Sequence, residues 1–365
     1  MQYKIIQNIE DFKVFNKTWL DLYEKGDCTP FQSFAWNYEW YIKQYANHSL
    51  FIVSVFEKEQ SSPCLIAPFM INSAGLARFI ADTHSDYSNF LVESSMKNSK
   101  LYDALKTLKK AIDKSNEVTA IELKNIKQTN PLMGIFMRLF DEKKIFFQSN
   151  ACSYIRLQPK KSFFDCFDYL TSKQRSELKR LFKKNPNLVY IRHTVHTSPF
   201  PRSTLIEIVQ EMRQKGIRDK NFLGNDLLNV IEALYNEGLL TIMELKNQNG
   251  ETLALNLLLV NEKEKNYLFW IDLYKDIPFI NLSSYLYLFK YLCENLDEAF
   301  TVDFGRGLYD YKIKNFLPNI ETQFTFFFSK NNTQFVRYLF KTFFILSIKN
   351  FYKQHKSTIN RLLRR

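Results

Sequence analysis

Two groups of three short apolar runs, one in each half of the chain, constrain the fold most strongly. Each run is bounded by polar turns: 50–57, 64–71 and 76–81 in the first half, and 239–246, 252–260 and 266–271 in the second. Runs of this length, rich in aliphatic and aromatic residues, are typical of β-strands. The dipeptide Asn249-Gly250, between the first two runs of the second group, is a strong hairpin signal. We therefore expect a β-sheet in each half.

Segments with apolar residues at helical spacing surround both groups. They predict helices at 9–25, through Trp36 and Trp40, and at 98–114, 163–170, 172–185, 203–215, 225–237 and 283–296. Further strands are predicted at 118–124, 153–158, 188–193, 300–304 and 322–328. This mixture indicates an α/β (α+β) fold, in which each half holds a mixed, mostly antiparallel sheet flanked by helices.

The chain is long enough for two hydrophobic cores. Its 365 residues exceed one ordinary core, which favours two domains. We place them at 1–150 and 151–330, followed by a basic amphipathic helix in 331–365. The apolar fraction of 45% and the aromatic fraction of 16% suffice for packed cores and exclude disorder as the main state.

The cysteines and histidines argue against a disulfide framework and against a metal site. The five cysteines are widely spaced and form no CxxC pair, which fits a reducing cytoplasm. His193 and His196 lie in a polar stretch without an acidic neighbour, so we interpret them as surface histidines. The N-terminus lacks the apolar stretch of a signal peptide, and the apolar segment 335–348 is too short to cross a bilayer. We expect a cytoplasmic protein without a metal.

The net charge of +12 predicts anionic partners, such as phosphates or acidic lipid. Residues 331–365 carry eight Lys or Arg and no acid. No nucleic-acid-binding motif accompanies this charge, so a nucleic-acid partner is not expected. The C-terminal helix either packs on the second domain or lies on anionic lipid, peripheral to the inner membrane.

Five sequence blocks, in this order, resemble a known group of enzymes. They are TPFQSFAW at 29–36, Asp82 with Asp86 and Tyr87, SKQRSELKR at 172–180, TLALNLLLV at 252–260, and DFGRGLYDYK at 303–312. The first two look like the opening of tandem GNAT proteins. The others resemble the acetyltransferase domain associated with cellulose and exopolysaccharide biosynthesis, whose layout Fem-type aminoacyltransferases share. The resemblance implies two tandem GNAT-like domains with an acyltransferase active site between them.

The expected donor, an acyl-CoA such as acetyl-CoA, comes from this resemblance alone. The Q/R-x-x-G-x-G/A loop, which holds the pyrophosphate of acyl-CoA in GNAT enzymes, is not visible. The residues FINLSS at 279–284 stand before the predicted helix 283–296 instead. Backbone amides at a helix N-terminus can bind phosphate without glycine. The chain departs from the superfamily pattern at this point.

Acyl transfer needs a group that accepts the proton of the nucleophile and a positive group beside the carbonyl oxygen. The resemblance implies that Lys312 interacts with the acyl or phosphate group and that Asp86 helps to accept the amine proton. Asp82 or His84 could take the role of Asp86. From the residues alone, Lys312 could be a solvated lysine in a surface loop that contains glycine, and Asp86 could cap its own backbone in a turn.

Eight further residues are candidates for binding donor or substrate: Gln32, His84, Tyr87, Arg175, Lys179, Asp303, Arg306 and Tyr311. Asp303 and Arg306 flank one turn, where an ion pair that merely orders the loop is an equal alternative. Arg175 and Lys179 share one stripe of a basic helix, whose alternative is a solvated face. For Tyr311 the alternative is aromatic packing.

The leading hypothesis is an acyl-CoA-dependent N- or O-acyltransferase. Its acceptor would be a small molecule, a sugar linked to a lipid or nucleotide, or another cell-envelope precursor. The first alternative is a Fem-type transferase that uses aminoacyl-tRNA, although the sequence lacks the heptads of a coiled-coil arm. The second alternative is a non-catalytic GNAT scaffold that binds an anionic ligand.

Overall fold

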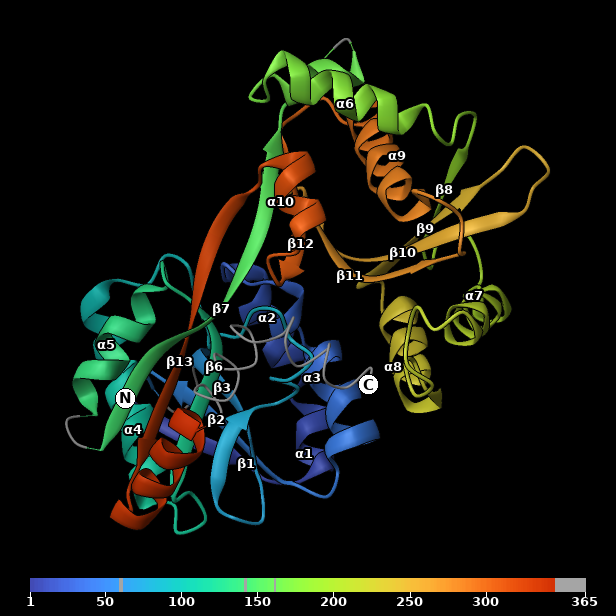
Figure 1. Ribbon diagram of the computed structural model, residues 1–365. Coiled ribbons are helices and arrows are strands. Elements are labelled where there is room, and N and C mark those ends of the chain that lie inside the picture. Colours follow the sequence, from blue (N-terminus) through green and yellow to red (C-terminus); the bar gives the residue numbers. More distant parts are fainter. Residues whose placement is uncertain (59–61, 141–142, 161, 345–365) are drawn as a thin grey trace, which may run out of the picture.

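The computed structural model describes residues 1–58, 62–140, 143–160 and 162–344 (Figure 1). Within these ranges, thirteen strands form one continuous mixed sheet. Its order is β1-β2-β3-β4-β6-β13-β7-β12-β11-β10-β9-β8, and β5 pairs with β3 outside this path. The long strands β7 and β13 run through the middle of the molecule and connect its two halves.

Most strands coincide with the expected runs to within a few residues. The strands of the first half are β1 (Gln2–Ile6), β2 (Ser49–Phe56), β3 (Pro63–Ile71), β4 (Leu76–Phe79), β5 (Leu91–Val92) and β6 (Ala120–Lys127). Those of the second half are β7 (Lys144–Leu157), β8 (Val189–His193), β9 (Leu240–Lys246), β10 (Thr252–Asn261), β11 (Asn266–Tyr274), β12 (Phe300–Arg306) and β13 (Asn319–Ser329).

Helices cover both faces of the sheet. In the first half they are α1 (Ile9–Val14), α2 (Asn16–Lys25), η1 (Pro30–Gln32), α3 (Phe34–Trp40), η2 (Tyr41–Tyr45), α4 (Asn98–Lys114) and α5 (Pro131–Leu139). In the second half they are η3 (Phe163–Phe167), α6 (Ser172–Phe182), α7 (Arg202–Gln214), α8 (Asn225–Asn236), α9 (Ile280–Asn295) and α10 (Asp310–Phe316).

The two halves repeat one topology. In the first, β1, β2, β3 and β4 are antiparallel neighbours, and α4 precedes β6, which pairs parallel to β4. In the second, β8, β9, β10 and β11 are antiparallel, and α9 leads to β12, which pairs parallel to β11. The strands that follow are exchanged, because β7 pairs with β12 and β13 pairs with β6. This repetition is the tandem arrangement that the sequence predicts.

One hydrophobic core is shared by both halves. It holds the apolar faces of α1, α2 and α3 together with those of α7 and α8. Trp36 and Trp40 are fully buried in it, and the Trp36 ring packs edge-on against Trp270 of β11 with centroids 5.2 Å apart. Helices α4 and α5 cover the other face of the first half, and α6 and α9 that of the second. The contact between Trp36 and Trp270 holds the first half against the second beside the loop that carries Asp86.

Several expected bounds were wrong. The helix expected at 9–25 is two helices, α1 and α2, which meet at Phe15. The strand expected at 153–158 begins at Lys144, because its polar first part pairs with the distant strand β13. The sequence pattern also missed β1, α5 and α10. Because β7 crosses residue 150, the division into 1–150 and 151–330 stays a prediction.

Residues 332–344 form a helix that packs on β13 and β6. The rest of the expected C-terminal helix lies outside the described residues. In the described ranges, no helix is long and apolar enough to cross a membrane.

Candidate functional site

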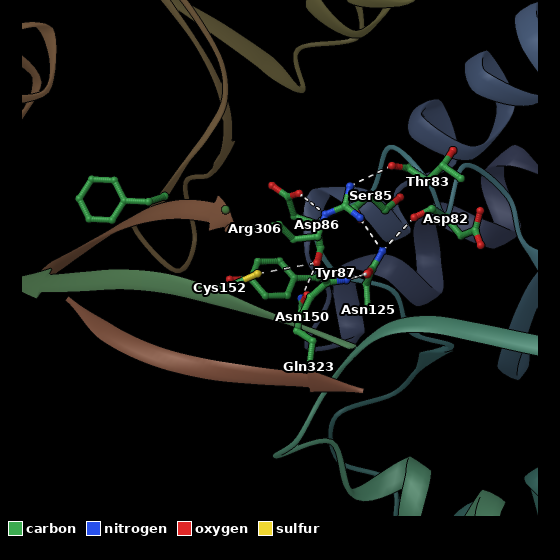
Figure 2. Close-up of polar contacts among 12 residues, drawn as sticks. Asp82, Thr83, Ser85, Asp86, Tyr87, Asn125, Asn150, Cys152, Arg306 and Gln323 are labelled. Atoms are coloured by element: carbon green, nitrogen blue, oxygen red, sulfur yellow. Dashed lines mark hydrogen bonds and ion pairs between the residues drawn. The ribbon is translucent and has the colours of Figure 1, made fainter. Parts of the chain in front are cut away.

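The loop between β4 and β5 carries Asp86 at the junction of the two halves (Figure 2). Buried side chains hold its backbone in place. Asn125 Nδ2 donates to the carbonyls of Asp82 and Ser85, at 2.9 Å each, and Gln323 Nε2 donates to the carbonyl of Asp86. The loop is therefore fixed by β6 of its own half and by β13 of the other.

Asp86 forms an ion pair across the junction. The Nε of Arg306 lies 2.8 Å from Asp86 Oδ1, and its Nη2 donates to the carbonyl of Thr83 at 2.9 Å. Burial raises the pKa of the Asp86 carboxyl, and the Arg306 guanidinium opposes this rise. The backbone amide of Arg306 also donates to this carboxyl. A carboxylate offers about four acceptor positions, so Asp86 can still accept a proton.

Asp303 makes a further polar contact between the halves. Its Oδ2 accepts from the hydroxyl of Tyr87 at 2.6 Å, and its Oδ1 accepts from the Gly305 amide at 2.8 Å. The alternative of an ion pair between Asp303 and Arg306 is therefore wrong, because Asp303 binds Tyr87 and Arg306 binds Asp86. Two residues close in sequence point to different partners, which spacing along the chain could not reveal.

Lys312 lies in α10 rather than in a loop, and its side chain is buried. Only 4% of the surface of Lys312 is exposed, so the alternative that it is a solvated surface lysine is wrong. Its Nζ donates to the Phe304 carbonyl at 2.7 Å and lies 5.0 Å from the centre of the Tyr309 ring. Burial lowers the pKa of Lys312, while the carboxylates of Asp272, Asp86 and Asp303 oppose this shift. Asp86 and Lys312 are thus within electrostatic reach of each other.

The ammonium of Lys312 has hydrogen-bonding capacity to spare. It holds three N–H donors, and among the described residues the Phe304 carbonyl is its one hydrogen-bond acceptor. A ligand oxygen is a suitable partner for the remaining two.

Asp272 is a site residue that sequence reasoning missed. It accepts from Asn256 Nδ2 at 2.9 Å and from the hydroxyl of Tyr285, which lies 3.1 Å from the hydroxyl of Tyr311. Burial raises its pKa. The sequence signal for Asp272 was an acidic residue in the mainly apolar strand β11. Burying a carboxyl in a strand is costly unless polar partners bind it.

His84 and Asp82 lie in the same loop as Asp86. The His84 ring stacks on Trp40 with centroids 3.7 Å apart, and burial, aided by Arg306, lowers its pKa to about 4. The imidazole is therefore neutral at pH 7. Asp82 is fully buried, and neither of its carboxylate oxygens has a hydrogen-bond partner among the described residues. Burial raises its pKa, which favours the protonated form.

Gln32 and Tyr87 line a polar cavity of about 200 Å³ together with Ser88 and Lys127. Gln32 Nε2 donates to the Tyr87 carbonyl at 3.1 Å, and the Lys127 ammonium lies 4.4 Å from the centre of the Tyr87 ring. The Ser88 hydroxyl is buried without a hydrogen-bond partner among the described residues. Such a group is one that a ligand in the cavity would satisfy.

Arg175 and Lys179 are not part of this cluster. They lie on α6, which Figure 1 places at the far end of the second half. Arg175 Nη1 donates to the Asp168 carbonyl at 3.4 Å, and Lys179 lies over the ring of Phe164. Asp168 borders a second cavity, of about 520 Å³, which Arg156 and Lys160 also line. The two predicted basic residues are near this cavity rather than near Asp86.

The interpretation of His193 as a surface residue was wrong. Its Nε2 lies 2.8 Å from Glu244 Oε2 and its Nδ1 lies 2.8 Å from Ser198 Oγ. Glu244 comes from β9, so the acidic neighbour is distant in sequence. Among the described residues, no group of three or more His, Cys, Asp or Glu is placed to hold a metal ion.

Gly305 brings the β12 backbone against Asp86. Its φ is +66°, and a Cβ added there would overlap Asp86 Oδ2. We expect Gly305→Ala to lower the free energy of unfolding by about 1–2 kcal/mol through the left-handed backbone alone, and further through displacement of Asp86. Gly216→Ala is the matched control, because Gly216 has φ +69° and open space around the added Cβ. Equal losses in urea unfolding would contradict the contact with Asp86.

The Asp303 carboxyl predicts a pH-dependent stability. Burial raises its pKa from 3.8 to about 6. Because the native state binds the proton more tightly, this stabilisation is fully present below pH 3.8 and is lost as pH rises through 6. We expect the free energy of unfolding, relative to Asp303→Asn, to fall by about 3 kcal/mol across this window. His84 contributes the opposite pH dependence in both proteins, so its contribution cancels when the two free energies of unfolding are subtracted. A difference that does not change with pH would contradict a buried Asp303 that titrates in this window.

No family model matches the sequence, and no curated protein matches it. Among solved structures, the C-terminal domain assigned to a lysylphosphatidylglycerol synthetase of Agrobacterium fabrum aligns with 90% of this chain and 95% of its own, at 12% identity and TM-score 0.57. L-PGS of Bacillus licheniformis aligns with 90% and 95%, at 15% identity and TM-score 0.56. FemX aligns with 88% and 97%, at 14% identity and TM-score 0.55.

These likenesses extend over nearly the whole chain and show a shared fold. Together with the repeated topology, they confirm the mixed α/β fold of two tandem halves that share one arrangement of strands and helices. Sequence identities of 12–15% support a shared fold, whereas the reaction has to be inferred from the side chains at the site.

Proposed function

We propose that this protein is an acyltransferase whose reaction centre lies at the junction of its halves, around Asp86 and Lys312. The observation that carries the proposal is that these two residues, 226 positions apart, are both buried and both contact the end of β12. Lys312 Nζ donates to the Phe304 carbonyl, and Asp86 lies against Gly305 and pairs with Arg306. The resemblance of the sequence to Fem-type enzymes implies complementary roles for them in one reaction. The solved structures of similar fold include a domain assigned to a lysylphosphatidylglycerol synthetase and FemX, whose name agrees with the sequence resemblance to Fem-type aminoacyltransferases.

The arrangement supplies what acyl transfer requires. An amine or hydroxyl attacks the carbonyl carbon of the activated acyl group, and a C–N or C–O bond forms as the bond to the donor breaks. The two spare N–H donors of Lys312 stabilise the negative charge that develops on the carbonyl oxygen. The Asp86 carboxylate accepts the proton that the nucleophile loses, and its raised pKa makes it a stronger base.

The donor expected from the sequence is an acyl-CoA, but the start of α9 favours a second candidate. The amides of Ile280 and Leu282 already donate to the Ile277 carbonyl and to Asn281 Oδ1. Asn185 Nδ2 also donates to Ser283 Oγ over this first turn. A pyrophosphate at this helix start would compete with these bonds. Aminoacyl-tRNA, the Fem-type donor, does not depend on this turn.

The acceptor we propose is a sugar or another cell-envelope precursor with a free amine or hydroxyl. The 200 Å³ cavity beside Tyr87, the neighbour of Asp86 in the chain, would hold a polar part of the acceptor, because its lining is polar. The narrower assignment, to enzymes associated with cellulose or exopolysaccharide synthesis, belongs to this proposal as well.

Donor titrations separate the candidates. A ligand that binds the native state raises the melting temperature by mass action, so we would measure thermal shifts with acetyl-CoA, a longer acyl-CoA and free CoA. A shift with an acyl-CoA supports the first donor. Transfer of a labelled aminoacyl group from tRNA, with no CoA shift, supports the second. Binding of anionic ligands without transfer from either donor would leave the non-catalytic scaffold and contradict the proposal.

A further inference from the structure

The helix 332–344 exposes an apolar arc to solvent. Four of its large apolar residues are more than half exposed: Val336 at 61%, Phe340 at 72%, Phe343 at 76% and Phe344 at 55%. At 100° per residue these four positions share one side of the helix, within an arc of about 100°. Three exposed phenylalanines within a turn and a half of helix form a larger apolar patch than single apolar residues scattered on a surface do.

The opposite side of the same helix is already docked. The rings of Phe335 and Tyr338 stack on Phe327 of β13, with centroids 6.2 Å and 3.6 Å away. The Tyr338 hydroxyl donates to Glu122 Oε1 of β6 at 2.8 Å. The helix thus has its own contact with the sheet, and its second apolar side points outward from it (the red helix after β13 in Figure 1).

Positive charge borders the apolar arc. Arg337 and Lys341 are exposed and lie next to it on the helical wheel. The sequence 331–365 contributes eight Lys or Arg and no acid. A second copy of the chain on this arc would bring like charges together, so the charge favours an anionic occupant.

We propose that this apolar arc docks on the surface of a bilayer that contains anionic lipid. The phenylalanines enter the level of the headgroups, and Arg337 and Lys341 lie on lipid phosphates. A helix with aromatic residues on one side and Lys and Arg beside them is suited to lie in this plane. The proposal is independent of the transferase reaction, because it uses none of the residues around Asp86 and Lys312.

Vesicle sedimentation with the full chain tests this surface. We expect binding to vesicles of phosphatidylcholine mixed equally with phosphatidylglycerol, weaker binding to phosphatidylcholine alone, and loss of binding at high salt. Phe340→Ser with Phe343→Ser should weaken the binding by about tenfold or more. Arg337→Gln with Lys341→Gln should remove the preference for the anionic vesicles.

The matched control is Val14→Ser with Leu20→Ser, which removes exposed apolar side chains from the N-terminal helices. This control should bind as the unchanged protein does, and thermal melting should show that every variant is folded. Equal binding by the phenylalanine variant would overturn the proposal, as would an absence of vesicle binding. A dimer that the phenylalanine variant dissociates, without vesicle binding, would assign the arc to a second copy and overturn it too.

Discussion

Replacing Lys312 by methionine should lower the rate of acyl transfer by about 10²–10³-fold, with little change in melting temperature. The ammonium is the charged group whose spare donors face the reaction, so its loss removes stabilisation of the carbonyl oxygen in the transition state. The methionine side chain has a similar length and can pack among Phe304, Tyr309 and Tyr311. The measurement is steady-state transfer from the donor that the titrations identify, with calorimetry on the same samples.

Lys314→Met is the matched control for this variant. Lys314 lies on the same helix α10, but its side chain is 75% exposed and pairs with the exposed Asp310. Surface pairs of this kind contribute about 0–1 kcal/mol, so both activity and stability should stay near those of the unchanged protein. If Lys312→Met unfolds the protein, or if it transfers as fast as Lys314→Met, the ammonium is structural and its assignment to the reaction centre fails.

The local elements could be predicted because short-range periodicity determines them. The helix expected at 98–114 is α4, with the same bounds, and the three apolar runs of each half are strands. The Asn249-Gly250 hairpin is present between β9 and β10, where Gly250 has φ +80°. In each case the apolar pattern of a few residues selects one local structure.

The pairings across the junction could not be predicted in this way. Tyr87 and Asp303 are 216 residues apart, and Asp86 and Arg306 are 220 apart. They meet because β7 and β13 are exchanged between the halves, a topological fact that no local pattern encodes. The burial of Lys312 has the same origin, since α10 is polar in sequence and is covered only when β12 packs in the sheet.

The sequence motifs indicated which residues lie close together better than they indicated which of these residues contact each other. The structure brings together Asp86, Tyr87, His84, Asp303, Arg306 and Lys312, whereas Arg175 and Lys179 lie apart. Asp272 was missed because an acid inside a strand run contributes little to a hydropathy pattern. Its partners Asn256 and Tyr285 come from β10 and α9, so only the assembled fold reveals it.

The Asp86–Arg306 ion pair should contribute both to the rate of acyl transfer and to the stability of the junction between the halves. Loss of a general base typically lowers a rate by 10²–10⁴-fold, so we expect a decrease of about that size for Asp86→Asn. A hydrogen bond between charged groups contributes about 1.5–3 kcal/mol, and a double-mutant cycle of Asp86→Ala and Arg306→Ala should give a coupling near the lower end. The Arg306 side chain is 30% exposed, and solvent therefore screens part of the interaction.

Arg306→Gln distinguishes a positioning role from a purely structural one. Because Arg306 opposes the rise in the pKa of Asp86, its removal should raise that pKa further. A base must be deprotonated to act, so the acidic limb of the pH–rate profile should move to higher pH while transfer at high pH is largely retained. The exposed pair Lys314 and Asp310 supplies the control cycle, with a coupling of about 0–1 kcal/mol. An unmoved acidic limb in Arg306→Gln, together with a coupling no larger than in the control cycle, would exclude Asp86 as the base that Arg306 tunes.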